Sequence, residues 1–216
     1  MIHADPDHLR NVLWPPDRNG ASGDLFALLD CARDPRIYPL IKRQQINYHC
    51  LFAGDLPQEL AEAAPYLVAL SPHSRLTEAL LTQGWGHSWG VILESSAILQ
   101  DLRRHFRSFL QVHDERGKKL LFRYYDPRVL RVYLPTCNEE ELQFVFGPVD
   151  RFVLEDEKSA GPVEFRRGEV GLEQIAIQPD QCTGSDCAKA RAHDYAEGSD
   201  ATVSHLWNDG LTAMFP

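Results

Sequence analysis

Short, continuously apolar runs alternate along residues 23–150 with stretches in which apolar side chains recur three or four positions apart. Runs at 25–29, 48–52, 66–70, 89–93 and 120–124 predict strands, and the first run suits a strand buried on both faces. The spacing of Ile37, Leu40 and Ile41 is typical of one face of a helix. We therefore predict a single mixed α/β domain of alternating strands and helices with a C-terminal appendage, whose strand order stays open.

Three polar residues carry the signals of helix starts. Asp34 and Asp126 are each followed by Pro-Arg, so their carboxylates suit the N-cap and the proline suits the first helical position. Thr136 stands three residues before Glu139, which is the spacing of a capping box. We predict these three residues to be structural caps.

The two ends of the chain differ from the middle in residue composition and in the pattern of apolar positions. Residues 1–22 are rich in Pro, Asp and Asn and predict an irregular N-terminal arm, on which Leu13 and Trp14 suit docking to the body. Residues 149–154 and 163–166 predict a hairpin, and 173–178 predict one more strand. Residues 179–216 carry net charge −4 and several large apolar side chains. We interpret residues 151–216 as a C-terminal hairpin and acidic partner-recognition segment.

Composition narrows the classes of partner. The 216 residues are 44% hydrophobic and 25% charged, which is typical of a globular protein. The net charge of −9 disfavours nucleic acid as a partner. No apolar run approaches the roughly 20 residues of a membrane span, and the first residues lack a signal peptide. We expect a cytoplasmic protein without membrane contact, whose five cysteines are free thiols.

The glycine-rich block at 84–90 allows three interpretations. Its spacing and position do not fit a dinucleotide-binding turn. Trp85 and Trp89 either wedge the turn against the core or form an aromatic patch for a partner. Ser88 lies in a Gly-x-Ser-x-Gly string, which leaves a small serine hydrolase with His105 or His113 as base as an alternative. Against it, the apolar run follows the serine, whereas a nucleophile elbow follows a strand.

A second alternative is a zinc-dependent interaction module. Cys182, Cys187, His193 and His205 are of the types that bind zinc, although four residues between the cysteines is at the edge of the usual spacing. No second cysteine pair completes such a site. We therefore predict neither a metal nor a cofactor.

Arginine gathers at two places on this acidic chain. A predicted helix over 96–112 presents Arg103, Arg104 and Arg107 away from its apolar stripe, as a solvated face or as a docking face for an acidic partner. Arg123, Tyr124 and Arg128 flank Asp126. Their cluster is interpreted first as a salt-bridge network and second as a carboxylate or phosphate site.

The stretch Phe-Arg-Tyr-Tyr-Asp-Pro-Arg-Val-Leu at 122–130 resembles the signature of the type VI secretion effector adaptor/chaperone family, first catalogued as a domain of unknown function. Further blocks agree in order, at 27–30, 65–70, 84–90, 102–106, 134–137 and 146–148. The resemblance covers about residues 23–150. It implies a non-enzymatic adaptor of a Gram-negative bacterium that binds a toxic effector and helps load it onto the VgrG-type spike protein.

The resemblance transfers no contact residues, so the surface predictions come from residue chemistry. We predict partner contacts at aromatic and arginine positions and expect the segment 151–216 to recognise the particular effector. The predicted contact residues are Trp85, Trp89, Arg103, Arg104, Arg107, Arg123, Tyr124, Arg128 and Trp207.

Overall fold

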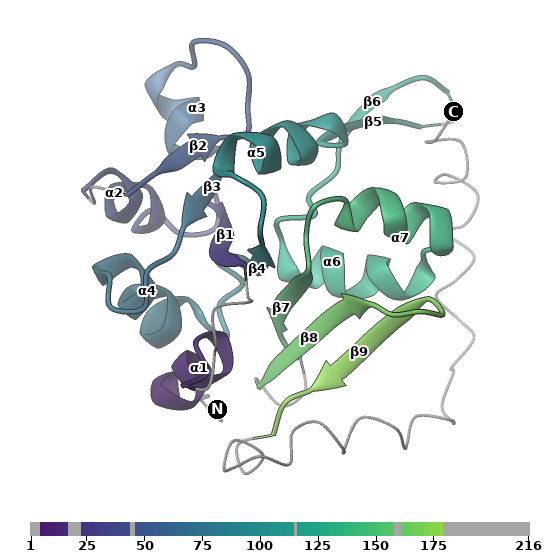
Figure 1. Cartoon of the computed structure of the whole chain (residues 1–216). Helices are drawn as coiled ribbons and strands as arrows, with labels where there is room; N and C mark the ends of the chain where they lie inside the picture. Colours follow the sequence, from purple (N-terminus) through teal and green to yellow (C-terminus); the bar gives the residue numbers. More distant parts are fainter. Residues whose placement is uncertain (1–4, 17–22, 44–45, 115, 158–160, 179–216) are drawn as a thin grey trace.

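The computed structural model describes residues 5–16, 23–43, 46–114, 116–157 and 161–178 (Figure 1). Its centre is a seven-stranded sheet in the order β2-β3-β1-β4-β7-β8-β9, in which every neighbouring pair is antiparallel. A separate two-stranded sheet pairs β5 with β6. The mixed α/β class predicted from the sequence is therefore confirmed.

The elements have the following bounds. The strands are β1 (Asp24–Asp30), β2 (Tyr48–Cys50), β3 (Pro65–Ala69), β4 (Gly90–Ser95), β5 (Gln111–His113), β6 (Lys119–Leu121), β7 (Arg151–Glu155), β8 (Pro162–Arg167) and β9 (Leu172–Ala176). The helices are α1 (Pro6–Leu13), α2 (Ile37–Lys42), α3 (Gln58–Glu62), α4 (Arg75–Ala79), α5 (Leu99–Ser108), α6 (Pro127–Tyr133) and α7 (Glu139–Phe146), with a π-helical turn η1 (Leu80–Gly84) and a 3-10 turn η2 (Leu134–Thr136). No helix in these ranges is long and apolar enough to cross a bilayer.

Strand β1 is buried on both faces, as its unbroken apolar run predicts. Because successive strand residues point to opposite faces, Phe26 and Leu28 enter one core, and Leu25, Ala27 and Leu29 enter another. The first core is covered by α5, α6 and α7, and the second by α1, α2 and α4. Figure 1 shows these two groups of helices on opposite sides of β1 and β4.

The N-terminal residues correct one prediction. Residues 6–13 form the helix α1, so an irregular arm is wrong for this part. Asp5 caps the helix by accepting the N–H of Asp7 at 3.1 Å, with proline at the first helical position. Leu9 and Leu13 are buried in the second core, and the predicted docking of Leu13 is confirmed.

The sheet continues past the predicted domain boundary at residue 150. The predicted hairpin and last strand are confirmed as β7, β8 and β9, but β7 pairs with β4 and extends the main sheet. Phe152, Leu154, Val163 and Phe165 are buried in the first core. Residues 151–178 are thus part of the same folded unit and not an appendage. The rest of the predicted recognition segment, 179–216, lies outside the described residues.

A buried ion-pair network also joins the strands on either side of that boundary. The guanidinium of Arg151 on β7 contacts Glu94 on β4 at 2.5 Å and Glu164 on β8 at 2.7 Å. All three side chains are buried. Removing one partner of such a network leaves an uncompensated buried charge, which is strongly destabilising. The three strands are therefore held together by charge as well as by backbone pairing.

Two of the three predicted caps occur as local hydrogen bonds. Asp126 caps α6 and accepts the N–H of Arg128 at 3.1 Å, as predicted. Asp34 accepts the N–H of Arg36 at 2.9 Å, but α2 begins only at Ile37. The Asp34 carboxylate therefore closes a turn before the helix and is not its N-cap.

The predicted capping box at Thr136 is wrong by two residues. Asn138 caps α7 and exchanges hydrogen bonds with Glu141, from N–H to side chain in both directions, at 2.8 Å and 2.9 Å. Thr136 instead donates its hydroxyl to the carbonyl of Tyr133 at 2.7 Å. The cause is η2, which extends the preceding helical turns through Thr136 and delays the start of α7.

Two predicted elements between 96 and 124 are shorter than expected. Helix α5 ends at Ser108, where the prediction continued to 112, and residues 111–113 form β5 instead. The apolar run at 120–124 contributes only β6 to the small sheet, outside the main one. The two strands project from the body as the hairpin seen beyond α5 in Figure 1.

Candidate interaction site

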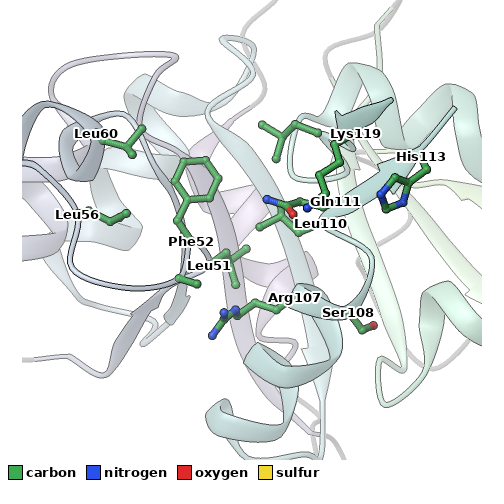
Figure 2. Close-up of a pocket in the computed structure, with 12 residues that line it drawn as sticks. Leu51, Phe52, Leu56, Leu60, Arg107, Ser108, Leu110, Gln111, His113 and Lys119 are labelled. Atoms are coloured by element: carbon green, nitrogen blue, oxygen red, sulfur yellow. The ribbon is translucent and has the colours of Figure 1, made fainter. Parts of the chain in front are cut away.

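An open groove of about 610 Å³ separates the segment after β2 from the end of α5 and the β5–β6 hairpin. Figure 2 shows side chains from the two walls facing each other across it. Five leucines, one phenylalanine and one alanine line it together with five polar or charged side chains. The lining residues are Leu51, Phe52, Ala53, Leu56, Leu60, Arg107, Ser108, Leu110, Gln111, His113, Lys119 and Leu121.

Local sequence signals build both walls. Gly54 adopts φ 81°, a left-handed conformation that glycine takes without strain, so the chain turns after β2 towards α3. On the other wall, the carboxylate of Asp114 accepts the N–H groups of Arg116 and Lys118 at 3.0 Å and 2.8 Å. Gly117 at φ 74° completes this hairpin turn. Glycine and aspartate thus position the groove from outside its lining.

The charge of the lining has one sign. Arg107 and Lys119 are cationic and exposed, and His113 is the third ionisable group that lines the groove. None of the lining residues is acidic, although the whole chain carries net charge −9. Opposite potentials across an interface steer association and favour specific partners. The groove therefore suits a ligand that combines apolar groups with negative charge.

The three arginines predicted as one docking face on α5 have separate surroundings. Arg107 lines the groove. Arg103 donates from Nε to the carbonyl of Cys50 at 3.1 Å and so ties α5 to the edge strand β2. Arg104 contacts Asp101 at 3.0 Å with a side chain that is 81% exposed. Of the three, only Arg107 belongs to the groove.

The aromatic residues predicted as contacts are buried. Trp85 and Trp89 lie in the second core, so the interpretation as a wedge against the core holds and the aromatic patch is wrong. Tyr124 is buried too, and its hydroxyl donates to the carbonyl of Phe106 at 2.7 Å. Buried side chains offer a partner no surface in this conformation. Trp207, the remaining predicted aromatic contact, lies outside the described residues.

The second arginine cluster is an ion-pair network, as its first interpretation predicts. Arg123 contacts Asp30 at 2.7 Å and Asp126 at 3.3 Å, while Arg128 contacts Asp126 at 2.6 Å. Both carboxylates are buried, at the end of β1 and at the start of α6. The network thus joins a strand end to a helix start. Sequence reasoning missed Asp30 as a member, although its position at the end of an apolar run is a signal.

Electrostatics favour the ionised form of Asp126. Burial raises the pKa of this carboxyl, but the hydrogen bonds from the side chain and backbone of Arg128 outweigh burial, so the pKa lies below its ordinary value. In the turn before α2, the hydrogen bond from the side chain of Arg36 lowers the pKa of Asp34 to about 2. Both carboxylates therefore stay charged and paired near neutral pH.

Ser88 does not meet either histidine proposed as its base. Its hydroxyl donates to Oε1 of Glu155 at 2.9 Å. His105 instead pairs with the carbonyl of Val145 at 3.0 Å, and His113 lines the groove. A serine nucleophile needs a base within hydrogen-bond reach, and the partner of this hydroxyl is a carboxylate. The geometry supports a structural role for Ser88.

The described cysteines are free and shielded. Cys31 is buried, and Cys50 and Cys137 are partly buried. Burial raises the pKa of all three thiols, that of Cys137 to about 12, which makes them poor nucleophiles.

The zinc alternative falls outside the residues whose structure is described. Cys182, Cys187, His193 and His205 all belong to the segment 179–216. Within the described ranges, no group of three or more His, Cys, Asp or Glu side chains is arranged to hold a metal ion.

Comparison with known proteins identifies the family of the domain. Residues 25–143, more than half of the chain, match the family described as "Domain of unknown function (DUF4123)". No curated protein and no solved structure matches the chain. The matched range contains every residue that lines the groove and the whole network of Asp30, Arg123, Asp126 and Arg128. The chain therefore belongs to the DUF4123 family.

Proposed function

We propose that this protein is an adaptor and chaperone of type VI secretion. It binds a toxic effector in the cytoplasm of a Gram-negative bacterium and helps load that effector onto a VgrG-type spike protein. The observation that carries the proposal is the match of residues 25–143 to the DUF4123 family. The motif resemblance at 122–130 and the ordered blocks around it link this domain to effector adaptors.

The groove supports a binding role within that domain. It is open, about 610 Å³ in volume, and its lining combines apolar side chains that a partner can cover with polar and cationic ones. Covering apolar surface stabilises a complex by roughly 25 cal/mol per Å² before the costs of association. An effector segment held there is also kept from aggregating through its own apolar residues. A chaperone acts in this way, because it covers the apolar residues of its client until the client is released.

The two-core architecture supplies a rigid support for such a surface. The groove walls come from the segment after β2, from α3, from the end of α5 and from the β5–β6 hairpin. Leu51 and Leu110 belong at the same time to the groove and to the first core. Because buried side chains fix these positions, the groove is largely formed before a partner arrives, which lowers the ordering cost of binding.

Co-expression with the products of the flanking genes tests the proposal. The full chain carries an affinity tag, and complexes are measured by size-exclusion chromatography with light scattering. We expect a stable complex with a large toxin-like neighbour or with a spike protein, and a neighbour that is insoluble when expressed alone. A chain that stays alone and leaves the solubility of every neighbour unchanged would refute the adaptor function.

A further inference from the structure

We infer that the groove between α3 and the β5–β6 hairpin binds an acidic peptide segment with large aliphatic or aromatic side chains. The effector supplies this segment, so the inference rests on the proposed function and names the site at which it acts. Three properties of the groove identify the chemistry of the occupant: its exposed leucines, its size, and its cations, which have no carboxylate partner among the residues that the structure describes.

The exposed leucines lie on both walls. Leu60 on α3 and Leu121 on β6 are each 44% exposed, and both line the groove. Phe52 and Leu56 continue the apolar lining between them and the core, as Figure 2 shows for the α3 wall. Apolar surface gathered in one concave place, in contrast to scattered single residues, is typical of a binding site. The occupant therefore carries apolar side chains.

Within the described part of the chain, the cations of the groove have no carboxylate partner. Arg107 and Lys119 line the hairpin side of the groove, and neither has a carboxylate within ion-pair distance among the described residues. The contrast with Arg104 is direct, since Arg104 on the same helix contacts Asp101. Two unpaired cations beside an apolar surface select carboxylates from the partner. The occupant is therefore acidic.

The dimensions fit a peptide. A volume of about 610 Å³ holds several side chains, and because the groove is open to solvent, the rest of a bound chain can continue outside it. Helices that place apolar side chains in a groove and keep charged ones at its rim are a recurring mode of peptide recognition. Apolar anchors of the segment then meet Leu60 and Leu121, while its carboxylates meet Arg107 and Lys119.

Peptide display on the immobilised full chain tests the inference. The probe is a library of random 12-residue peptides on phage, and the affinities of selected peptides are measured by fluorescence anisotropy. We expect the selected peptides to be enriched in Asp and Glu together with Leu, Phe or Trp, and to bind more weakly as salt rises. Selection of basic or neutral peptides, or no selection at all, would overturn the inference.

Matched variants locate the binding. Arg107→Glu and Leu60→Ser are expected to weaken the selected peptides at least about tenfold. The controls are Arg104→Glu, on the same helix outside the groove, and Val132→Ser, an exposed apolar position on α6. Urea unfolding verifies that all four variants are folded. Equal binding by the groove variants and the wild type would overturn the inference.

Two further measurements separate the inference from the proposed function. A co-expressed neighbour that stays bound to Arg107→Glu and Leu60→Ser refutes this site and leaves the adaptor function standing. Conversely, the selected acidic peptides can bind the groove of a protein that binds no co-expressed neighbour. This result supports the inference about the groove and refutes the adaptor function.

Other occupants give distinct results. A chain ending at residue 178 that binds the selected peptides at least tenfold more tightly than the full chain would assign the groove to residues 179–216. A dimer in light scattering that Leu60→Ser dissociates would assign it to a second copy. Either result overturns the inference.

Discussion

The hydroxyl and the backbone N–H of Ser88 both donate to Oε1 of Glu155, at 2.9 Å and 3.0 Å. The other carboxylate oxygen accepts the N–H of Gly86 at 2.6 Å. Glu155 is the last residue of β7, and Ser88 precedes β4 with φ 58°. One carboxylate thus holds a loop in a conformation that non-glycine residues seldom adopt.

Glu155→Ala is expected to lower the free energy of unfolding by about 2 kcal/mol, because three N–H or O–H donors lose a charged acceptor. Urea unfolding at pH 7 measures the change. Glu157→Ala is the control, since its carboxylate pairs with Arg131 but is 80% exposed. It should cost less than about 0.5 kcal/mol. Equal losses in the two variants would show that the loop does not depend on Glu155.

Asp126→Asn is expected to lower the free energy of unfolding at pH 7 by about 1–3 kcal/mol, because the buried carboxylate that pairs with Arg128 and caps α6 loses its charge. The pKa of Asp126 is lower in the folded than in the unfolded chain, since the hydrogen bonds from Arg128 outweigh burial. The unfolded chain therefore binds more protons near pH 4. The contribution of the carboxylate is complete above that pH and is lost as pH falls through the folded pKa.

The difference in the free energy of unfolding between the wild type and Asp126→Asn should accordingly become smaller as the pH falls from 5 to 3. Urea unfolding at several pH values measures this difference. Asp101→Asn provides the comparison, because its pair with Arg104 is exposed. If the free energy of unfolding of Asp126→Asn differs from that of the wild type by the same amount at every pH, the pKa of Asp126 is not lowered by folding.

A chain ending at residue 150 is expected not to fold. It lacks β7, β8 and β9 and leaves the first core without Phe152, Leu154 and Phe165. Burial of each such side chain contributes about 1.5–3 kcal/mol, so the loss of all three is comparable to the whole stability of a typical domain, about 5–15 kcal/mol. Circular dichroism and thermal unfolding measure the outcome. A chain ending at 178 keeps these strands and is the control that should unfold cooperatively.

His105 is expected to make the protein less stable in mild acid. Burial lowers its pKa, opposed by the hydrogen bond to the carbonyl of Val145. The unfolded chain therefore binds more protons than the folded one near pH 6, and stability falls as pH drops below the unfolded pKa of about 6.5. His49, whose pKa is also lowered by burial, contributes with the same sign.

The free energy of unfolding of His105→Gln should fall less between pH 7 and pH 5 than that of the wild type. Urea unfolding across this range measures the two slopes. Equal slopes would mean that His105 does not carry the acid sensitivity.

Interactions between residues close in the sequence were predictable. The apolar run of β1, the cap at Asp126 and the pairing of Arg128 with that cap depend on neighbours within a few positions. Side-chain periodicity and local hydrogen bonds act over this range. Even here, the predicted capping box at Thr136 was wrong. Thr136 belongs to the turn η2, so α7 begins later and Asn138 forms the capping box.

Interactions between distant segments were decided only by the tertiary structure. The sequence does not state that β7 pairs with β4, that Trp89 lies in a core, or that Glu155 holds Ser88. The groove likewise needs residues near 52–60 and 107–121 on facing walls. Apolar attraction has no direction and marks a residue for burial without naming its partner. Which segments meet is therefore set by the packing of the whole chain. The same packing forms the groove and buries Trp85 and Trp89.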